Sequence, residues 1–412
     1  MVSTSPPGAC RSLIDFAMRG ERVGGKSQTI FPMTGPRHVM HLLDADHISG
    51  PAKTVLNSCR FTESGRYVKS VAVFDQGGRN RYAEDLLSRG VSVFGIEEGK
   101  PRNLGKIHSY IKNIRAVRRL ILEHRVDLVH THGYKADVIG YLAAKTTGRK
   151  IVTTQHGYIE NSAQATFYRR LAIATAKRMD RVIAVSDAMR NRLMKYGVPA
   201  GKVVTIRNAI VSEDYAGRGR DRDLLERLHL IGRTPVIGCI GRISPEKGQR
   251  ILCDAFGEVR KRFPEASLVF VGKGPELEDL KNRYGREGEA IVFVGHQADV
   301  KPFISIFDLH VLPSYTEGLP NVVLETGCMG VVTVGTAVGG TPECIIDRVT
   351  GLLVQPGRAD ELARAITLVL GDEDLRGELE RNVMEYVTKE YDFRKRVEKM
   401  MGLYDVLWTD AG

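Results

Sequence analysis

The chain has 412 residues, 42% of them hydrophobic and 26% charged, a composition typical of a globular protein with room for two or three domains. No apolar run approaches the roughly 18 residues that a membrane-spanning helix needs. Residues 1–210 carry 34 Lys and Arg against 16 Asp and Glu (+18), whereas residues 211–412 carry 26 against 33 (−7). This contrast indicates two domains with different partners, the basic one suited to nucleic acid, an anionic membrane or a phosphorylated substrate.

Residues 1–36 are rich in Gly, Pro and Ser, and we expect a loosely ordered leader there. Their short apolar stretch is interrupted by charges and lacks a basic start, so it does not resemble a secretory signal. The six cysteines include no CxxC pair, and several lie in apolar segments, where free thiols behave as small hydrophobic groups. We therefore predict a reduced, cytoplasmic protein.

Short β-branched runs alternate with longer helical patterns from residue 38 onward. The predicted strands are 38–44, 68–74, 91–96, 127–132, 150–155, 181–186 and 202–207 in the first half, and 235–241, 267–272, 290–295, 309–314, 331–335 and 351–355 in the second. Such alternation is typical of parallel sheets covered by helices, so we predict an α/β fold of two doubly wound, Rossmann-like domains facing across a cleft. The polar stretch at 208–234 marks the boundary, which gives domains at 37–210 and 211–390 and a last segment at 391–412.

The first loop, DADHISGPAKTVL at 44–56, joins the first strand to the first helix. Gly50 allows a sharp turn toward a phosphate group. Asp44 and Asp46 form a DxD pair, a pattern that can hold a divalent metal. Its position directly after the first strand, together with the cations described below, favours a site without metal.

A basic helix is predicted at 104–125, with Ile and Val at helical spacing toward the core and Lys106, Lys112, Arg115, Arg118 and Arg119 mostly elsewhere. A second basic cluster comprises Arg169, Arg170, Lys177, Arg178 and Arg181. Both can be solvated helix faces. The functional alternative is docking on an anionic membrane that presents a lipid-linked acceptor.

Histidines follow two strands of the first half. His130 and His132 in DLVHTHG lie on one side of their strand, and His156 in TTQHGY ends the next one. Each can be a buried, hydrogen-bonded core histidine, or can contact a sugar or a phosphate in the cleft. No Asp or Glu accompanies them at metal-ligand spacing, so we predict no zinc site.

Two segments of the second half place cations and glycines directly after strands. In IGRISPEKGQRIL (240–252), Arg242 and Lys247 flank a Ser-Pro turn and can neutralise a diphosphate leaving group, or form an exposed basic turn. In VFVGKGPELEDL (269–280), Gly274 follows a lysine and can belong to a tight turn or bring a backbone amide to a nucleotide.

The segment SYTEGLPNVVLETGCMG (314–330) carries the clearest signal. Glu317 lies in a loop after a strand, and Pro320 suits the first turn of a helix over 321–329 that holds Glu325. Free amides at the start of this helix favour a diphosphate, and a carboxylate accepts two hydrogen bonds from sugar or ribose hydroxyls. The structural alternative is a helix cap beside a solvated glutamate.

Together these segments resemble the family 4 retaining glycosyltransferases, whose fold is called GT-B. The resemblance covers about 38–408, and its most specific part is the pair Glu317 and Glu325 in EGLPNVVLE. The other matching segments, in the order and spacing typical of the family, are VSDAMRNRLMKYGVPAGKVVTIRNAI (185–210), GRISPEKG, VGKGP, FVGH (293–296) and GGTPE (339–343).

The resemblance implies a role for each matching position. Glu325 looks like the carboxylate that binds the donor's ribose, and Glu317 like the one that holds hydroxyls of the transferred sugar. Arg242 and Lys247 resemble the pair that stabilises the departing diphosphate, and His156 resembles the histidine beside the reacting centre. The remaining expected donor-binding residues are Gly50, Gly274, Gly318, Leu319, Pro320 and Asn321. The last helix is implied to return onto the first domain.

The chain departs from the family's usual pattern in three places. The first loop reads SGPAK where GGAE is common, and Pro51 lacks an N–H that could contact phosphate. The helix reads ETGCMGVV where EAMACGxP is common, so Thr326 and Gly327 should weaken it, and Val331 replaces the usual proline. Because some members with altered loops are poor enzymes, an inactive relative stays an alternative.

The resemblance implies a hexosyltransferase-type enzyme (EC 2.4) without metal or cofactor. It would transfer a sugar, with retention of configuration, from a nucleotide-diphosphate sugar to a glycan or lipid-linked acceptor, and UDP is the expected nucleotide. The expected setting is surface polysaccharide or lipopolysaccharide biosynthesis, in the cytoplasm or on the inner face of the membrane. The alternatives are a nucleotide-sugar epimerase of the same fold and a non-enzymatic binder of an anionic polymer, although we expect no nucleic-acid partner.

Overall fold

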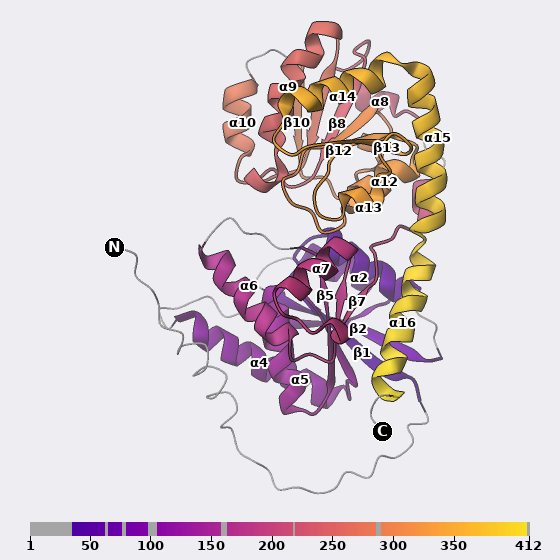
Figure 1. Cartoon of the computed structure of the whole chain (residues 1–412). Helices are drawn as coiled ribbons and strands as arrows, with labels where there is room; N and C mark the ends of the chain where they lie inside the picture. The colour runs from indigo at the N-terminus through magenta and orange to yellow at the C-terminus, as the bar shows by residue number, and fades with distance from the viewer. Residues whose placement is uncertain are drawn as a thin grey trace, which may run out of the picture.

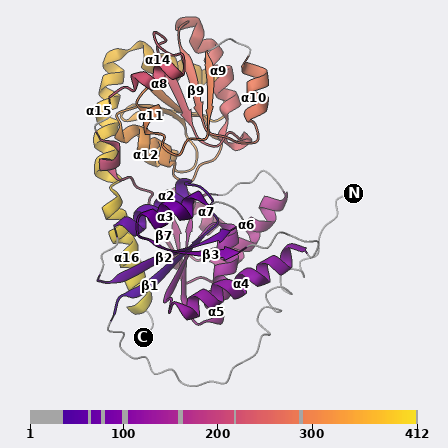
Figure 2. The ribbon, with the colours of Figure 1, turned by 180° about the vertical axis from the view of Figure 1, so that it is seen from behind.

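The computed structural model describes residues 35–61, 65–75, 80–97, 105–157, 163–216, 219–285 and 290–409, so the predicted leader lies almost entirely outside it. The described chain forms two lobes, each built on a parallel sheet and flanked by helices, and a long pair of helices runs along one side of both (Figures 1 and 2). Within these residues no helix is both long enough and apolar enough to cross a bilayer.

The first domain holds a seven-stranded sheet in the order β3-β2-β1-β4-β5-β6-β7, and all its pairings are parallel. The strands are β1 (Arg37–Leu43), β2 (Tyr67–Asp75), β3 (Ser92–Glu97), β4 (Leu128–His132), β5 (Lys150–Gln155), β6 (Arg181–Ala184) and β7 (Val203–Thr205). The helices are α2 (Gly50–Arg60), α3 (Arg81–Ser88), α4 (Gly105–Glu123), α5 (Tyr134–Thr146), α6 (Ala163–Ala176) and α7 (Asp187–Lys195).

The second domain holds a six-stranded parallel sheet in the order β10-β9-β8-β11-β12-β13. The strands are β8 (Val236–Ile240), β9 (Ser267–Val271), β10 (Ile291–Gly295), β11 (Leu309–Leu312), β12 (Thr333–Thr336) and β13 (Gly351–Val354). The helices are α8 (Arg222–Arg227), α9 (Gln249–Arg262), α10 (Leu277–Tyr284), α11 (Lys301–Ile304), α12 (Asn321–Cys328), α13 (Thr341–Cys344) and α14 (Ala359–Gly371). Every strand predicted from the sequence is present with ends that differ by no more than two residues, and the predicted fold is confirmed.

Both sheets reverse their strand order in the middle, between β1 and β4 and between β8 and β11. Ligands of doubly wound sheets bind at such switch points, beyond the carboxyl ends of the strands. Gly133, Arg242 and Glu317 lie in the loops after β4, β8 and β11, and Gly50 begins the helix that follows the loop after β1. The topology alone therefore places most of the segments described in the sequence analysis at the carboxyl ends of the strands of the two sheets.

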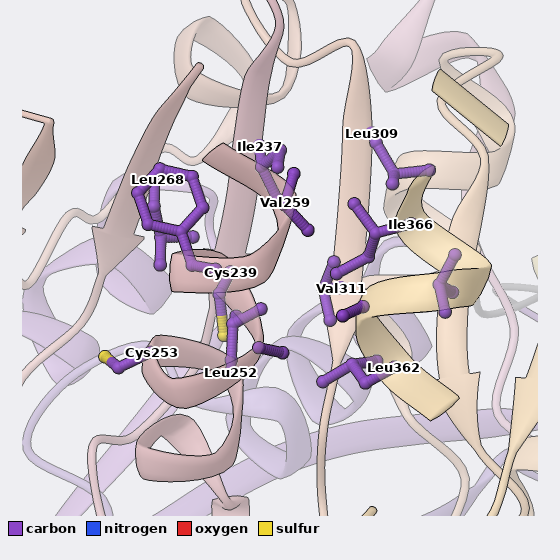
Figure 3. Close-up of a cluster of buried hydrophobic side chains, with 14 of the residues drawn as sticks. Ile237, Cys239, Leu252, Cys253, Val259, Leu268, Leu309, Val311, Leu362 and Ile366 are labelled. Atoms are coloured by element: carbon purple, nitrogen blue, oxygen red, sulfur yellow. The ribbon is translucent and has the colours of Figure 1, made fainter. Parts of the chain in front are cut away.

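An apolar core fixes the second sheet against α9 and α14 (Figure 3). Its labelled side chains, all less than 5% exposed, are Ile237, Cys239, Leu252, Cys253, Val259, Leu268, Leu309, Val311, Leu362 and Ile366. Burial of each large aliphatic side chain contributes about 1.5–3 kcal/mol to the stability of the fold. This core therefore holds the loops at the ends of the strands on a rigid sheet. The five cysteines in the described part of the chain are free thiols.

The chain crosses between the lobes at two adjacent points. Ile210 N donates to Tyr391 O at 2.8 Å, and Phe393 N donates to Ile210 O at 3.0 Å. Helix α15 (Glu373–Glu390) packs on the second domain, whereas α16 (Phe393–Thr409) buries its apolar face against strands of the first sheet. The last helix thus fastens the two domains along one side.

Candidate functional site

Lys247 and Glu317 form an ion pair at the carboxyl end of the second sheet. Lys247 Nζ lies 2.7 Å from Glu317 Oε1, which also accepts a 2.6 Å hydrogen bond from Ser314 Oγ. The next residue, Gly248, has a φ of 68°, and a Cβ there would lie 2.1 Å from the carbonyl oxygen of Pro313. Only glycine lets the loop after β8 come this close to the loop after β11, and this approach positions the ion pair.

Arg242 begins the same loop as Lys247. Its carbonyl oxygen accepts a 2.8 Å hydrogen bond from Gln249 Nε2, which anchors the backbone. Its guanidinium lies 3.9 Å from Glu246 Oε1, and half of the side chain is exposed. The charged end is therefore loosely held and can turn toward a nearby anion.

The loop between β11 and α12 contacts the first domain. A Cβ on Gly318 would lie 1.9 Å from the carbonyl oxygen of His156, so the two domains meet here through bare backbone. A few residues on, Asn321 Nδ2 donates to Gly50 O at 3.4 Å. The structure thus brings four of the expected site residues, from opposite domains, to one interdomain contact.

Three further expected residues shape the loops through backbone and packing. Pro320 is the N-cap of α12, and its carbonyl oxygen accepts from Val323 N at 3.2 Å. Leu319 is 4% exposed, and its carbonyl oxygen accepts a 3.0 Å hydrogen bond from Asn208 Nδ2 of the first domain. Gly274 lies against the loop after β8, where a Cβ would come within 1.9 Å of Ile243 O.

The first loop differs from the sharp turn expected at Gly50. Gly50 is the first residue of α2, and its φ is not positive. Pro51 stands in the first helical turn, where a missing N–H breaks no hydrogen bond within the helix. The two carboxylates of the DxD pair have local partners, because Asp44 pairs with Lys135 at 3.3 Å and Asp46 with the neighbouring His47.

Glu325 is paired with a cation of the other domain. Its Oε1 lies 2.6 Å from Lys53 Nζ, and the residue is only 8% exposed. Lys53 also donates to the hydroxyl of Tyr215, whose pKa is raised by burial and by the nearby Glu325 carboxylate. Sequence reasoning missed Lys53, which was noted only as part of the unusual loop SGPAK.

A second polar link joins the domains at GGTPE. Glu343 accepts hydrogen bonds from Ala188 N at 3.0 Å and from Arg207 Nε at 2.9 Å, and both donors belong to the first domain. The sequence placed this segment in the family pattern but gave no partner for its glutamate.

His156 is connected to two buried histidines. Its Nε2 lies 3.2 Å from His132 Nδ1, and His132 Nε2 lies 3.0 Å from His41 Nδ1. Burial lowers the pKa of His156 to about 3 and those of His41 and His132 well below the usual value. His41 was overlooked, although it pairs in register with His130, and the adjacency of their strands was the signal that could have found it.

The other strand histidine, His130, is a core residue. Its nitrogens lie 2.6 Å from the hydroxyl of Tyr404 and 2.7 Å from that of Thr154. With His41 and His132 it forms a group whose potential metal ligands lie within 4.8 Å of one another. The rings of His130 and His132 are stacked, however, with centroids 4.5 Å apart and planes 28° apart, and lone pairs in stacked planes do not aim at a common ion.

Two family models match the chain, one for each domain. The model described as Glycosyltransferase Family 4 matches residues 54–214, and the model described as Glycosyl transferases group 1 matches residues 234–372. Together they cover the first domain from within α2 onward and nearly all of the second domain.

Curated relatives include a mannosyltransferase and a galactosyltransferase. The GDP-mannose-dependent alpha-(1-6)-phosphatidylinositol monomannoside mannosyltransferase of Mycolicibacterium smegmatis is 30% identical over 269 residues, which are 62% of this chain and 70% of that protein. The UDP-Gal:alpha-D-GlcNAc-diphosphoundecaprenol alpha-1,3-galactosyltransferase of Escherichia coli is 26% identical over 315 residues, which are 74% of this chain and 81% of that protein.

Among solved structures, Anabaena HepE in complex with UDP-glucose superposes with a TM-score of 0.78 at 22% identity, covering 90% of this chain and 99% of that one. This likeness extends across both domains and supports the same fold. With the two family models and the mannosyltransferase at 30% identity, it leads to one conclusion: the chain belongs to glycosyltransferase family 4 and has the GT-B fold.

Proposed function

We propose that the protein transfers a sugar from a UDP-sugar, with retention of configuration and without a metal, to a lipid-linked or glycan acceptor of surface polysaccharide or lipopolysaccharide assembly. The observation that carries this proposal is the Lys247–Glu317 pair, held at the carboxyl end of one domain beside the loop that contacts His156 of the other. One relative, named for UDP-galactose and a diphosphoundecaprenol acceptor, and a structural neighbour that binds UDP-glucose, support the donor and the acceptor class.

In this mechanism the bond between sugar C1 and the diphosphate oxygen breaks ahead of attack. Lys247 and Arg242 stabilise the charge that develops on the diphosphate, with help from the amides at the start of α12. Glu317 holds hydroxyls of the sugar, and Glu325 holds those of the ribose. The acceptor hydroxyl then attacks from the same face, and the departing phosphate oxygen takes its proton.

Two side-chain cations perform the neutralising role that a divalent metal has in other transferases. The ion pair with Glu317 holds the Lys247 ammonium in place, so little reorganisation is needed when a diphosphate binds beside it. We therefore propose that catalysis is independent of metal ions.

The acceptor is proposed to reach the site from a membrane surface. Lys112, Arg115, Arg118 and Arg119 are exposed on α4, while Val117 and Ile121 of the same helix are buried. A basic helix face of this kind binds anionic lipid headgroups by electrostatic attraction, with about 1 kcal/mol for each cation. This supports a peripheral location on the cytoplasmic face.

The test is an assay of the purified chain with UDP-glucose, UDP-galactose, UDP-GlcNAc and GDP-mannose, each with and without a diphosphoundecaprenol-linked acceptor. We expect release of UDP that requires the acceptor, an α-linked product from an α-linked donor by NMR, and the same rate in EDTA. Conversion of a UDP-sugar into a second UDP-sugar, or into a free altered sugar, without acceptor would indicate the epimerase alternative. Product of inverted configuration would contradict the retaining mechanism.

A further inference from the structure

Three imidazoles form a hydrogen-bonded chain that ends at the contact between the two domains. His41 Nδ1 lies 3.0 Å from His132 Nε2, and His132 Nδ1 lies 3.2 Å from His156 Nε2. The chain starts on β1, continues through the end of β4, and reaches the loop after β5, the strand beside β4. Its outer member, His156, is the residue whose carbonyl oxygen meets Gly318 of the second domain.

The tautomers of these rings are coupled. Burial keeps all three rings neutral at ordinary pH, so each ring has one N–H and one lone pair. Each hydrogen bond in the chain needs one N–H and one lone pair, and the choice made at one ring decides the choice at the next. Only two arrangements satisfy both hydrogen bonds. In the outward arrangement His41 donates to His132 and His132 donates to His156, and in the inward arrangement both hydrogen bonds run the other way.

The inner end of the chain favours the outward arrangement. His41 Nε2 is buried and has no hydrogen-bond partner among the described residues. In the inward arrangement that nitrogen would carry an N–H without an acceptor, near the positive charge of Lys69, which acts on His41. In the outward arrangement it carries a lone pair instead, and a lone pair is favoured by a nearby cation.

The outward arrangement decides what His156 offers to a ligand. His41 Nδ1 donates to His132 Nε2, and His132 Nδ1 donates to His156 Nε2. The proton of His156 is then on Nδ1, its remaining nitrogen. A hydrogen-bond donor at this point suits the oxygens of an anionic diphosphate or of a sugar, whereas a lone pair would repel them.

We propose that His132 and His41 are positioning residues that hold His156 in the Nδ1–H tautomer, so that His156 donates a hydrogen bond to an oxygen of the nucleotide-diphosphate donor. This inference rests on the proposed function only for the identity of the ligand. His130, stacked on His132 but bonded to Tyr404 and Thr154, lies outside the chain and provides a matched control.

The first experiment is ¹⁵N NMR of the uniformly histidine-labelled, full-length enzyme without substrate, with signals assigned by single substitutions. We expect a proton on Nδ1 and none on Nε2 of His156, and a shift of the Nδ1–H signal when UDP is added. A proton on Nε2 would overturn the inference, as would a stoichiometric metal ion in the purified protein that is released only when His41 or His132 is replaced.

The second experiment compares substitutions by UDP affinity and by kcat/KM. His132→Leu removes the donor to His156, and we expect a 10- to 100-fold loss, the range for partners that orient a functional histidine. His132→Asn keeps an N–H near the position of Nδ1 and should recover most of this loss. His130→Leu removes an equally buried ring and should destabilise the fold to a similar extent while UDP affinity changes less than threefold.

The outcomes separate the inference from the proposed function. Equal losses of UDP affinity for His130→Leu and His132→Leu, or no recovery with His132→Asn, would mean that His132 acts only through the stability of the fold, and the inference would fail. A correct His156 tautomer and normal UDP binding, without sugar transfer to any acceptor, would contradict the proposed function and leave the positioning role in place.

Discussion

Lys53 Nζ, in the first domain, lies 2.6 Å from Glu325 Oε1, in the second. The side chains are 34% and 11% exposed, so Glu325 is largely removed from water and Lys53 supplies the charge that compensates it. Partly exposed ion pairs contribute about 0–1 kcal/mol, because solvent screens them and ordering two side chains costs entropy. If Glu325 binds ribose as proposed, the ribose hydroxyls compete with Lys53 for this carboxylate.

This relationship predicts a gain of affinity when Lys53 is removed. Lys53→Met abolishes the competition for Glu325, and we expect UDP to bind up to about fivefold more tightly, equivalent to about 1 kcal/mol. Titration calorimetry measures this change directly. Arg60→Met is the control, since Arg60 belongs to the same helix but pairs with Asp214, and it should leave UDP affinity unchanged. Weaker UDP binding by Lys53→Met would show that Lys53 binds the nucleotide itself.

Lys247→Ala should separate catalysis from binding. Removal of one group that stabilises developing charge lowers kcat by about 100- to 1,000-fold, whereas the ground-state diphosphate keeps its other contacts. We expect UDP affinity to fall by less than tenfold. Lys261→Ala, which removes an exposed lysine paired with Glu258 on α9, should retain the parent kcat. Near-normal turnover by Lys247→Ala would contradict the assignment of this residue to the leaving group.

The basic face of α4 can be tested without any acceptor. Replacement of Arg115, Arg118 and Arg119 by Gln should weaken binding to vesicles containing anionic phospholipid by roughly 100-fold at low salt, since each cation contributes about 1 kcal/mol. Sedimentation with vesicles measures this loss, and neutral vesicles should bind none of the variants.

The control for α4 replaces the exposed Lys261, Lys281 and Arg283 of the second domain by Gln, which changes net charge by the same amount on another surface. These substitutions should leave vesicle binding within about twofold of the parent. Equal losses for the two triple variants would indicate attraction by net charge alone, without a docking face.

The strands were predictable because their signal is local. Buried parallel strands such as β8 and β11 are continuous apolar runs, and a short window of sequence detects them. The partners of the site residues could not be predicted in this way, because they depend on contacts between segments that are distant in the sequence. Lys53 and Glu325 are 272 residues apart, and His41 meets His132 only once β1 pairs with β4.

Gly327, which was expected to weaken α12, has a packing role that the sequence did not reveal. Gly327 was expected to destabilise this helix, but a Cβ there would lie 2.8 Å from a methyl group of Val383 and 2.9 Å from one of Val387. Its absence lets α15 pack closely on α12. Thr326 Oγ1 donates back to Val322 O at 3.0 Å, so its hydroxyl is satisfied within the helix.

The apolar core should respond to truncation according to burial. Leu252→Ala, at a fully buried position on α9, should lower the free energy of unfolding by about 2–5 kcal/mol, because the cavity cannot close completely. Leu368→Ala on α14, where the side chain is 41% exposed, should change it by less than about 0.5 kcal/mol. Urea unfolding followed by circular dichroism measures both, and similar losses would contradict the packing described for α9.

Stability should decline in acid because buried histidines stay neutral in the folded state. Burial lowers the pKa of His310 from 6.5 to about 3, and that of His156 equally. Between these two pH values the unfolded chain binds a proton that the folded chain does not, so the free energy of unfolding rises with pH. The stability that each such histidine contributes is therefore lost progressively as the pH falls below 6.5. Each such histidine contributes a slope of about 1.4 kcal/mol per pH unit.

One buried carboxyl acts in the opposite direction. Burial raises the pKa of Asp137 from 3.8 to about 6, so the folded state binds the extra proton there and gains stability as pH falls through this range. Since His41, His130 and His132 are also kept neutral by burial, the histidines outnumber Asp137 and the net effect is acid destabilisation.

The decisive measurement is the pH slope of unfolding by urea between pH 6 and pH 4.5 in a histidine variant. His310 is suitable because burial alone accounts for its lowered pKa and because it lies in the second domain, away from the imidazole chain. His310→Gln should reduce the slope by about 1.4 kcal/mol per pH unit, whatever its effect on stability at pH 7.5. An unaltered slope in His310→Gln would mean that His310 takes up its proton in the folded protein at the same pH as in the unfolded chain.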